Sequence, residues 1–139
     1  MPRLSKQPQT QFIRQPLRRL KIVTLHKGQL LYALPQARQG IGRMKKAILC
    51  EGQLDAIAFH RAGIDCAVAP LGTAFTPEQA RMIRRYSNNL ILSFDADSAG
   101  QKAVLRAAEI LLPLSVDLKV LQIPGGKDPD EVFEKNNII

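Results

Sequence analysis

Residues 90–100 read LILSFDADSAG, and they indicate the class of fold that the chain adopts. Leu90 to Phe94 form a short apolar run that stops at an aspartate, as a buried β-strand does. A helix is expected from Ser98 to Leu112, with Pro113 closing it. Its core-facing side chains should share one stripe, namely Ala99, Ala103, Ala107 and Leu111. A buried strand that leads into an amphipathic helix is the repeating unit of α/β proteins.

A similar unit precedes this stretch. The apolar run 47–50 ends at Glu51 and Gly52 and predicts another buried strand. A helix is expected from Gln53 to Ala62, and Gly63 suits its C-terminal cap. Gly52 and Gly100 leave room for a close approach of backbone or phosphate. The residues predicted to face the core on this helix are Leu54, Ile57, Ala58 and Ala62.

Two more strands and two more helix starts complete the pattern. Residues 66–69 and 116–123 predict the strands. Thr76 to Gln79 predict a helix start, in which Thr76 caps, Pro77 occupies the first turn and Gln79 completes a capping box. That helix should turn Ala80, Ile83 and Tyr86 inward, and Asp128-Pro129 should open a last helix. Strand and helix thus alternate four times, which predicts an α/β fold with a small open parallel sheet flanked by helices.

Acidic residues gather where these strands end. Glu51 ends one strand, and Asp95 and Asp97 end another. Ligands of open parallel sheets bind beyond the carboxyl ends of the strands. Carboxylates that converge there repel one another unless a cation lies between them, and all-oxygen ligands favour Mg²⁺ or Mn²⁺. The further candidates for this metal site are Asp55, Asp128 and Asp130.

Two of these acids have a simpler interpretation. Asp55 could serve only the N-terminus of its helix, and Asp128 is a natural N-cap before Pro129. The pattern at Glu51 and Asp95-Ala96-Asp97 is less easily explained by local structure, because two strands run directly into acids.

Charge divides the chain into two parts. Residues 1–46 carry eleven Lys or Arg and no acid, whereas residues 47–139 carry nine basic and twelve acidic residues. A basic segment beside an acidic one suggests a polyanion for the first and cations for the second. The alternative for residues 1–20, which contain three prolines, is a solvated and disordered leader.

Several functions lack their sequence signals. The sequence has no P-loop, no G-x-G-x-x-G after a strand and no C-x-x-C pair for a zinc ribbon. No apolar run approaches the ~20 residues of a membrane span, and no apolar stretch follows the basic N-terminus as in a signal peptide. Cys50 and Cys66 lie in apolar runs and are expected to be buried free thiols, which fits a cytoplasmic protein.

Five motifs follow one another along the chain: HKG at 26–28 with LYAL at 31–34, CEGQLD at 50–55, APLGT at 69–73, SFDADSAG at 93–100 and PGGKDPD at 124–130. Together they resemble the Toprim domain of bacterial-type DNA primases and cover about residues 25–135. CEGQLD resembles E-G-x-x-D, and SFDADSAG resembles D-x-D-x-A-G. APLGT is similar to the primase L-G-T turn, and PGGKDPD to G-x-D-P-D. The first motif is similar to the element that precedes the Toprim domain.

The resemblance implies a Toprim fold over residues 25–139. It also implies a metal-dependent nucleotidyltransferase that makes short RNA primers on single-stranded DNA from ribonucleoside triphosphates. Glu51, Asp95 and Asp97 match the catalytic, metal-binding acids, with Asp128, Asp130 and Asp55 beside them. The basic residues expected to contact nucleotide or DNA are Lys27, Arg14, Arg18, Arg19 and Lys127.

Residues 1–24 depart from the family pattern. They are expected to be a basic leader left from the upstream polymerase subdomain, because QFIRQP at 11–16 only partly matches K-Y-x-N-x-P-E. A zinc module and a helicase-binding domain are expected to be absent, so contact with the replicative helicase would need domains outside this chain. Two alternatives remain: a module that binds metal and nucleic acid without synthesis, and a Toprim nuclease or topoisomerase fragment. The last would need a tyrosine nucleophile or a nuclease domain elsewhere, and Tyr32 and Tyr86 look like helix packing residues.

Overall fold

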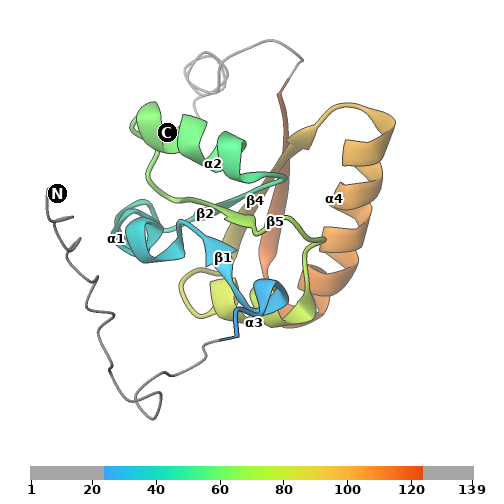
Figure 1. The fold of residues 1–139 in the computed structure, drawn as a ribbon, viewed down its shortest axis with the longest axis horizontal. Helices are drawn as coiled ribbons and strands as arrows, with labels where there is room; N and C mark the ends of the chain where they lie inside the picture. Colours follow the sequence, from blue (N-terminus) through green and yellow to red (C-terminus); the bar gives the residue numbers. More distant parts are fainter. Residues whose placement is uncertain (1–23, 124–139) are drawn as a thin grey trace, which may run out of the picture.

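The computed structural model describes residues 24–123 and shows one five-stranded sheet (Figure 1). Its strands are β1 (Leu31–Tyr32), β2 (Ala47–Cys50), β3 (Ala67–Pro70), β4 (Asn89–Asp95) and β5 (Asp117–Ile123), in the order β1-β3-β2-β4-β5. Strands β2 to β5 are parallel, as the sequence predicts. The sheet as a whole is mixed, because β1 pairs antiparallel with β3. Being only two residues long, β1 has no alternation by which the sequence could reveal it.

Within residues 24–123, four α-helices and two short 3-10 helices surround this sheet. They are α1 (Leu34–Met44), α2 (Gln53–Arg61), α3 (Pro77–Arg84), α4 (Ser98–Leu111), η2 (Lys27–Gln29) and η3 (Leu112–Leu114). The step from β2 to β3 runs in the opposite direction to the step from β4 to β5. Right-handed crossovers therefore put α2 and α4 on opposite faces of the sheet, as Figure 1 shows. None of the helices within residues 24–123 is long and apolar enough to cross a bilayer.

The core lies in the centre of the sheet. All four residues of β2 and all four of β3 are buried, as expected of parallel strands covered on both faces. Cys50 and Cys66 are buried free thiols, as predicted. Burial raises the pKa of the Cys66 thiol to about 11 and that of Cys50 well above its ordinary value, so neither thiol is reactive near neutral pH.

Helix boundaries were predicted well, but the buried faces only in part. Thr76 and Gln79 form the predicted capping box, and Gly63 has a φ of 84° after α2. On α2 the predicted face is wrong: Leu54 is 81% exposed, and Ala56 and Phe59 are buried instead. Two apolar stripes compete on this helix, and the stripe with the large phenyl ring packs inward because it buries more area.

Smaller corrections concern α3 and α4. Tyr86 lies beyond the end of α3 and is 41% exposed, so it does not pack in the core. Ala107 and Leu111 of α4 are buried as predicted, whereas Ala99 is exposed. Helix α1 was not predicted, because Pro35, Gly40 and Gly42 weaken its helical pattern. The helix expected after Asp128 lies outside the described residues.

Gly100 brings the start of α4 against the end of β4. A Cβ atom at this position would lie 2.0 Å from the carbonyl oxygen of Asp95. This is the close backbone approach predicted for Gly100. The glycine therefore controls where the loop 95–97, with its two aspartates, is held relative to the sheet.

Replacing Gly100 with alanine should be destabilising for this reason. Gly100→Ala should lower the free energy of unfolding by about 1–3 kcal/mol, because the methyl group overlaps the Asp95 carbonyl. Gly42→Ala is the matched control, since nothing lies within 4 Å of that position in α1. It should raise stability by about 0.5–1 kcal/mol. Urea unfolding of both variants measures the difference, and equal effects would show that the close approach does not constrain this loop.

Candidate active site

The candidate site lies at the carboxyl edge of the sheet, between β2 and β4. These strands are adjacent and parallel, and Cys50 pairs with Ser93. Glu51 follows β2, and Asp95 is the last residue of β4. Because α2 leaves toward one face and α4 toward the other, a crevice opens between the two strand ends, which is the usual ligand site of open α/β sheets.

A hydrogen bond joins the two strand ends. The backbone N–H of Asp95 donates to Oε2 of Glu51 over 3.3 Å. The bond holds one oxygen of Glu51 next to the Asp95 backbone, and both residues are exposed to solvent. The structure thus brings together the two acids that the sequence places at the ends of neighbouring strands.

Asp55 joins this pair from the first turn of α2. Its Oδ2 accepts a hydrogen bond of 3.2 Å from the Gly52 N–H, so the helix-capping interpretation is correct for this residue. Partial burial raises the pKa of the Asp55 carboxyl, the Gly52 hydrogen bond opposes that rise, and the nearby charge of Asp95 adds to it. Asp55 therefore caps a helix and also lies close enough to Asp95 to feel its charge.

Asp97 has a structural role that the sequence analysis missed. It is the N-cap of α4, and its Oδ1 accepts a hydrogen bond of 2.7 Å from the Gly100 N–H. An aspartate directly before a helix start is a capping signal, which could have been recognised in the sequence. One oxygen of Asp97 is thus engaged in the cap, and metal binding would fall to the other.

Of the remaining predicted site residues, the structure describes Lys27 alone. Lys27 lies in η2 and is exposed. Residues Arg14, Arg18, Arg19, Lys127, Asp128 and Asp130 lie outside residues 24–123. Within that range, no three Asp, Glu, His or Cys side chains are gathered closely enough to hold an ion. The acids present still fit a hard divalent cation, because their donors are all carboxylate oxygens.

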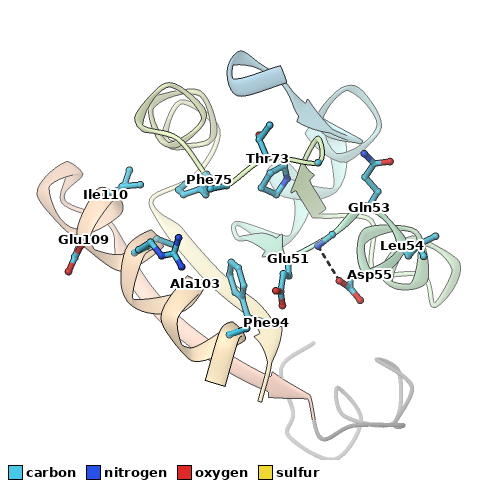
Figure 2. A pocket seen from close by; sticks show the side chains of 17 residues that line it. Glu51, Gln53, Leu54, Asp55, Thr73, Phe75, Phe94, Ala103, Glu109 and Ile110 are labelled. Carbon is cyan, nitrogen blue, oxygen red and sulfur yellow. Dashed lines mark hydrogen bonds between the residues drawn. The ribbon is translucent and has the colours of Figure 1, made fainter. Parts of the chain in front are cut away.

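A hollow of about 960 Å³ extends from Glu51 and Asp55 along α4. Figure 2 shows Glu51 and Asp55 at one end of it and Ala103 and Ile110 on its α4 wall. Thr73 and Phe75, from the loop between β3 and α3, form another wall. No local pattern in the sequence indicates this hollow, because its walls come from four separate segments.

Comparison with known proteins identifies the family. Residues 48–133 match the model of one protein family, described as Toprim-like. The chain belongs to the Toprim-like family. The matched range contains both strand ends with their acids, so the Toprim fold expected from the sequence motifs is confirmed.

Curated relatives of this Toprim-like chain are DNA primases. The DNA primase of Campylobacter jejuni is 46% identical over 114 residues, which are 82% of this chain and 19% of that protein. The DNA primase of Synechococcus elongatus is 46% identical over 118 residues, 81% of this chain and 17% of that protein. The chain therefore spans less than a fifth of the length of these relatives.

Solved primase structures have a similar fold. The Aquifex aeolicus primase, comprising zinc-binding and RNA polymerase domains, superposes with a TM-score of 0.72 and 35% identity. The match covers 82% of this chain and 28% of that one. The two folds agree over most of the described residues.

The unusual pKa of Asp55 predicts a pH dependence of stability. Because its pKa is raised in the folded state, the folded protein binds more protons than the unfolded one as this carboxyl titrates. The contribution of Asp55 to stability therefore falls as the pH rises through the ordinary aspartate range to the raised value. Asp55→Asn, which can still accept from Gly52, should be more stable relative to the parent at neutral pH than at acid pH.

Asp65→Asn is the matched control with the opposite sign. A hydrogen bond from Arg43 holds the pKa of Asp65 below its usual range, so its stabilisation is present at neutral pH and lost as the pH falls. Urea unfolding at acid and at neutral pH gives the stability of each variant relative to the parent. As the pH rises, this relative stability should increase for Asp55→Asn and decrease for Asp65→Asn. A change in the same direction for both would mean that Asp55 does not titrate with a raised pKa.

Proposed function

We propose that this chain is the metal-binding catalytic part of a DNA primase, which joins ribonucleoside triphosphates into short RNA primers on single-stranded DNA during replication. The observation that carries the proposal is the juxtaposition of Glu51 and Asp95 at the ends of two paired parallel strands. The relatives named DNA primase support it. A DnaG primase catalytic domain bound to single-stranded DNA, with a TM-score of 0.69 and 36% identity over 81% of this chain and 37% of that one, supports it further.

Glu51, Asp95 and the second oxygen of Asp97 would hold Mg²⁺ or Mn²⁺, with Asp128 and Asp130 as further ligands. When bound, such an ion neutralises triphosphate charge and makes the attacking hydroxyl a better nucleophile. The protein's part is to hold the acids in place. The Asp95 N–H fixes one oxygen of Glu51, and the Gly100 N–H fixes one oxygen of Asp97.

Basic residues would hold the phosphates without reading sequence. Lys27, Lys127 and the leader arginines Arg14, Arg18 and Arg19 are the proposed contacts, because cations neutralise the nucleic-acid backbone and release its counterions. Contact with the replicative helicase would come through other parts of the enzyme, and the cytoplasm is the proposed location.

A second candidate function is binding of metal and nucleic acid without primer synthesis. It is favoured by the capping roles of Asp55 and Asp97, which give these two acids a use apart from metal binding. A test must therefore measure synthesis itself, in a protein that contains the rest of the enzyme.

A chimeric primase provides this test. Residues 25–139 would replace the matching segment of the Campylobacter jejuni primase, and incorporation of labelled ribonucleotides would be measured on single-stranded DNA with Mg²⁺ or Mn²⁺. The chimera should make primers. Glu51→Gln and Asp95→Asn should each lower the rate by about a hundredfold, because each removes charge that holds the ion.

Asp117→Asn is the control. Asp117 begins β5, so it lies at the amino ends of the parallel strands, and its replacement should leave the rate unchanged. The melting temperatures of all chimeras should agree, so that a lost rate is not lost folding. A folded chimera that binds DNA but makes no primer would favour the binding module. Acid variants as active as their parent would refute the proposed site.

A further inference from the structure

Gln79 is a buried amide in the first turn of α3. It is 0% exposed, and within residues 24–123 Ser93 is the other buried polar side chain. Burying an amide costs free energy unless its polar atoms are hydrogen-bonded. The partners of Gln79 therefore explain why a glutamine is tolerated in this position.

Two hydrogen bonds between Gln79 and Thr76 serve the helix itself. Gln79 Oε1 accepts from the Thr76 N–H over 3.0 Å, and Thr76 Oγ1 accepts from the Gln79 N–H over 3.1 Å. This reciprocal pair is the capping box of α3. A glutamate at position 79 would serve that purpose as well, because only an acceptor is needed.

Three further hydrogen bonds reach a distant part of the chain. Gln79 Nε2 donates to the carbonyl oxygens of Leu30 over 2.6 Å and Lys27 over 3.2 Å. The hydroxyl of Thr76 donates to the Gly28 carbonyl oxygen over 2.6 Å. Capping requires none of these three bonds. They form a clamp, consisting of Thr76 and Gln79, on the turn 27–30.

The clamp and the pairing of β1, which begins at Leu31, are what attach the turn 27–30 to the sheet. Helix η2 contains no buried residue, so few apolar contacts stabilise it. The Leu30 N–H donates to the Lys27 carbonyl oxygen, and the Thr76 Cγ2 atom lies 3.4 Å from where a Cβ of Gly28 would be. The three clamp bonds are thus the main polar attachment of this turn to the α/β body.

The clamp also ties the turn to the wall of the hollow. Thr76 and Gln79 follow directly on the loop that contributes Thr73 and Phe75 to the hollow beside Glu51 (Figure 2). In Figure 1, η2 lies against α3. Lys27 is exposed in this turn, so its ammonium group is free to meet a ligand from solvent.

We infer that Thr76 and Gln79 are positioning residues, which hold Lys27 in place for a phosphate group of the ligand at the proposed site. The inference rests on the proposed function for the ligand class. A lysine on an ordered turn binds a phosphate more tightly than one on a mobile segment, because the backbone need not be ordered on binding. The phosphate is that of either a nucleic-acid backbone or a nucleotide.

The test is a double-mutant cycle in the complete 139-residue chain. Thr76→Val keeps the shape and the Cγ2 contact but removes the hydroxyl, whereas Thr76→Ser keeps the hydroxyl. Gln79→Met removes the amide. Each is made with Lys27 and with Lys27→Ala. Affinity is measured for two probes, a fluorescein-labelled oligo-dT by anisotropy and ATP by calorimetry.

For at least one probe, Lys27→Ala should weaken binding about fivefold, and Thr76→Val and Gln79→Met should do the same in the Lys27 protein. In the Lys27→Ala protein neither should have a further effect, and Thr76→Ser should bind as the parent does. Hydrogen exchange of the Leu30 amide should quicken in Thr76→Val, and the melting temperature should fall by several degrees, because this variant also loses the cap of α3. An effect on oligo-dT alone assigns the phosphate to a nucleic-acid strand, and an effect on ATP alone assigns it to a nucleotide.

Two results would overturn the inference. One is an equal loss of affinity with and without Lys27, which would mean that the clamp is only structural. The other is unchanged binding of both probes in Lys27→Ala. Neither result bears on the acids, because primer synthesis by the chimera and its loss in Glu51→Gln test the proposed function separately.

Discussion

The in-register pairing of β2 with β4 is the constraint on which the rest of the site depends. With Cys50 opposite Ser93, the next residues along each strand meet at one edge, and those residues include Glu51 and Asp95. A shift of one residue in either strand would turn its side chains to the other face and would separate the two acids. The buried Ile48, Leu49 and Leu92 oppose such a shift, because they would lose their place in the core.

The acids at this edge have structural roles that leave part of each carboxylate available for the proposed ion. Asp55 and Asp97 each give one oxygen to the N-terminus of a helix, and Glu51 gives one to the backbone of Asp95. Such hydrogen bonds fix the direction of the remaining oxygens before any ion arrives. They also offset part of the repulsion between neighbouring carboxylates. The pKa of Asp55 is raised mainly by burial, and the nearby charge of Asp95 adds to the rise. Structural and ion-binding roles are therefore compatible in the same side chains.

Local signals in the sequence predicted the four parallel strands, the capping box at Thr76 and Gln79, and the meeting of Glu51 with Asp95. What the sequence could not show depends on contacts between distant segments. Phe59 is buried and Leu54 is exposed because of how α2 packs against the sheet. Strand β1 exists only because β3 offers it an edge, and the bonds from Gln79 to Lys27 and Leu30 span about fifty residues. Asp97 was within reach of local reasoning, since it directly precedes a helix.

Locating the site at which a divalent ion binds is the most direct test of the proposed metal centre. Mn²⁺ broadens the nuclear magnetic resonances of nearby amides, so a titration of the ¹⁵N-labelled chain locates the ion. If the acids at the ends of β2 and β4 form the metal centre, the amides of 51–52 and 95–97 should broaden first, at low Mn²⁺, while Asp117 at the opposite edge stays sharp. Persistent signals from 51–52 and 95–97, with broadening elsewhere or uniformly over the chain, would contradict the account.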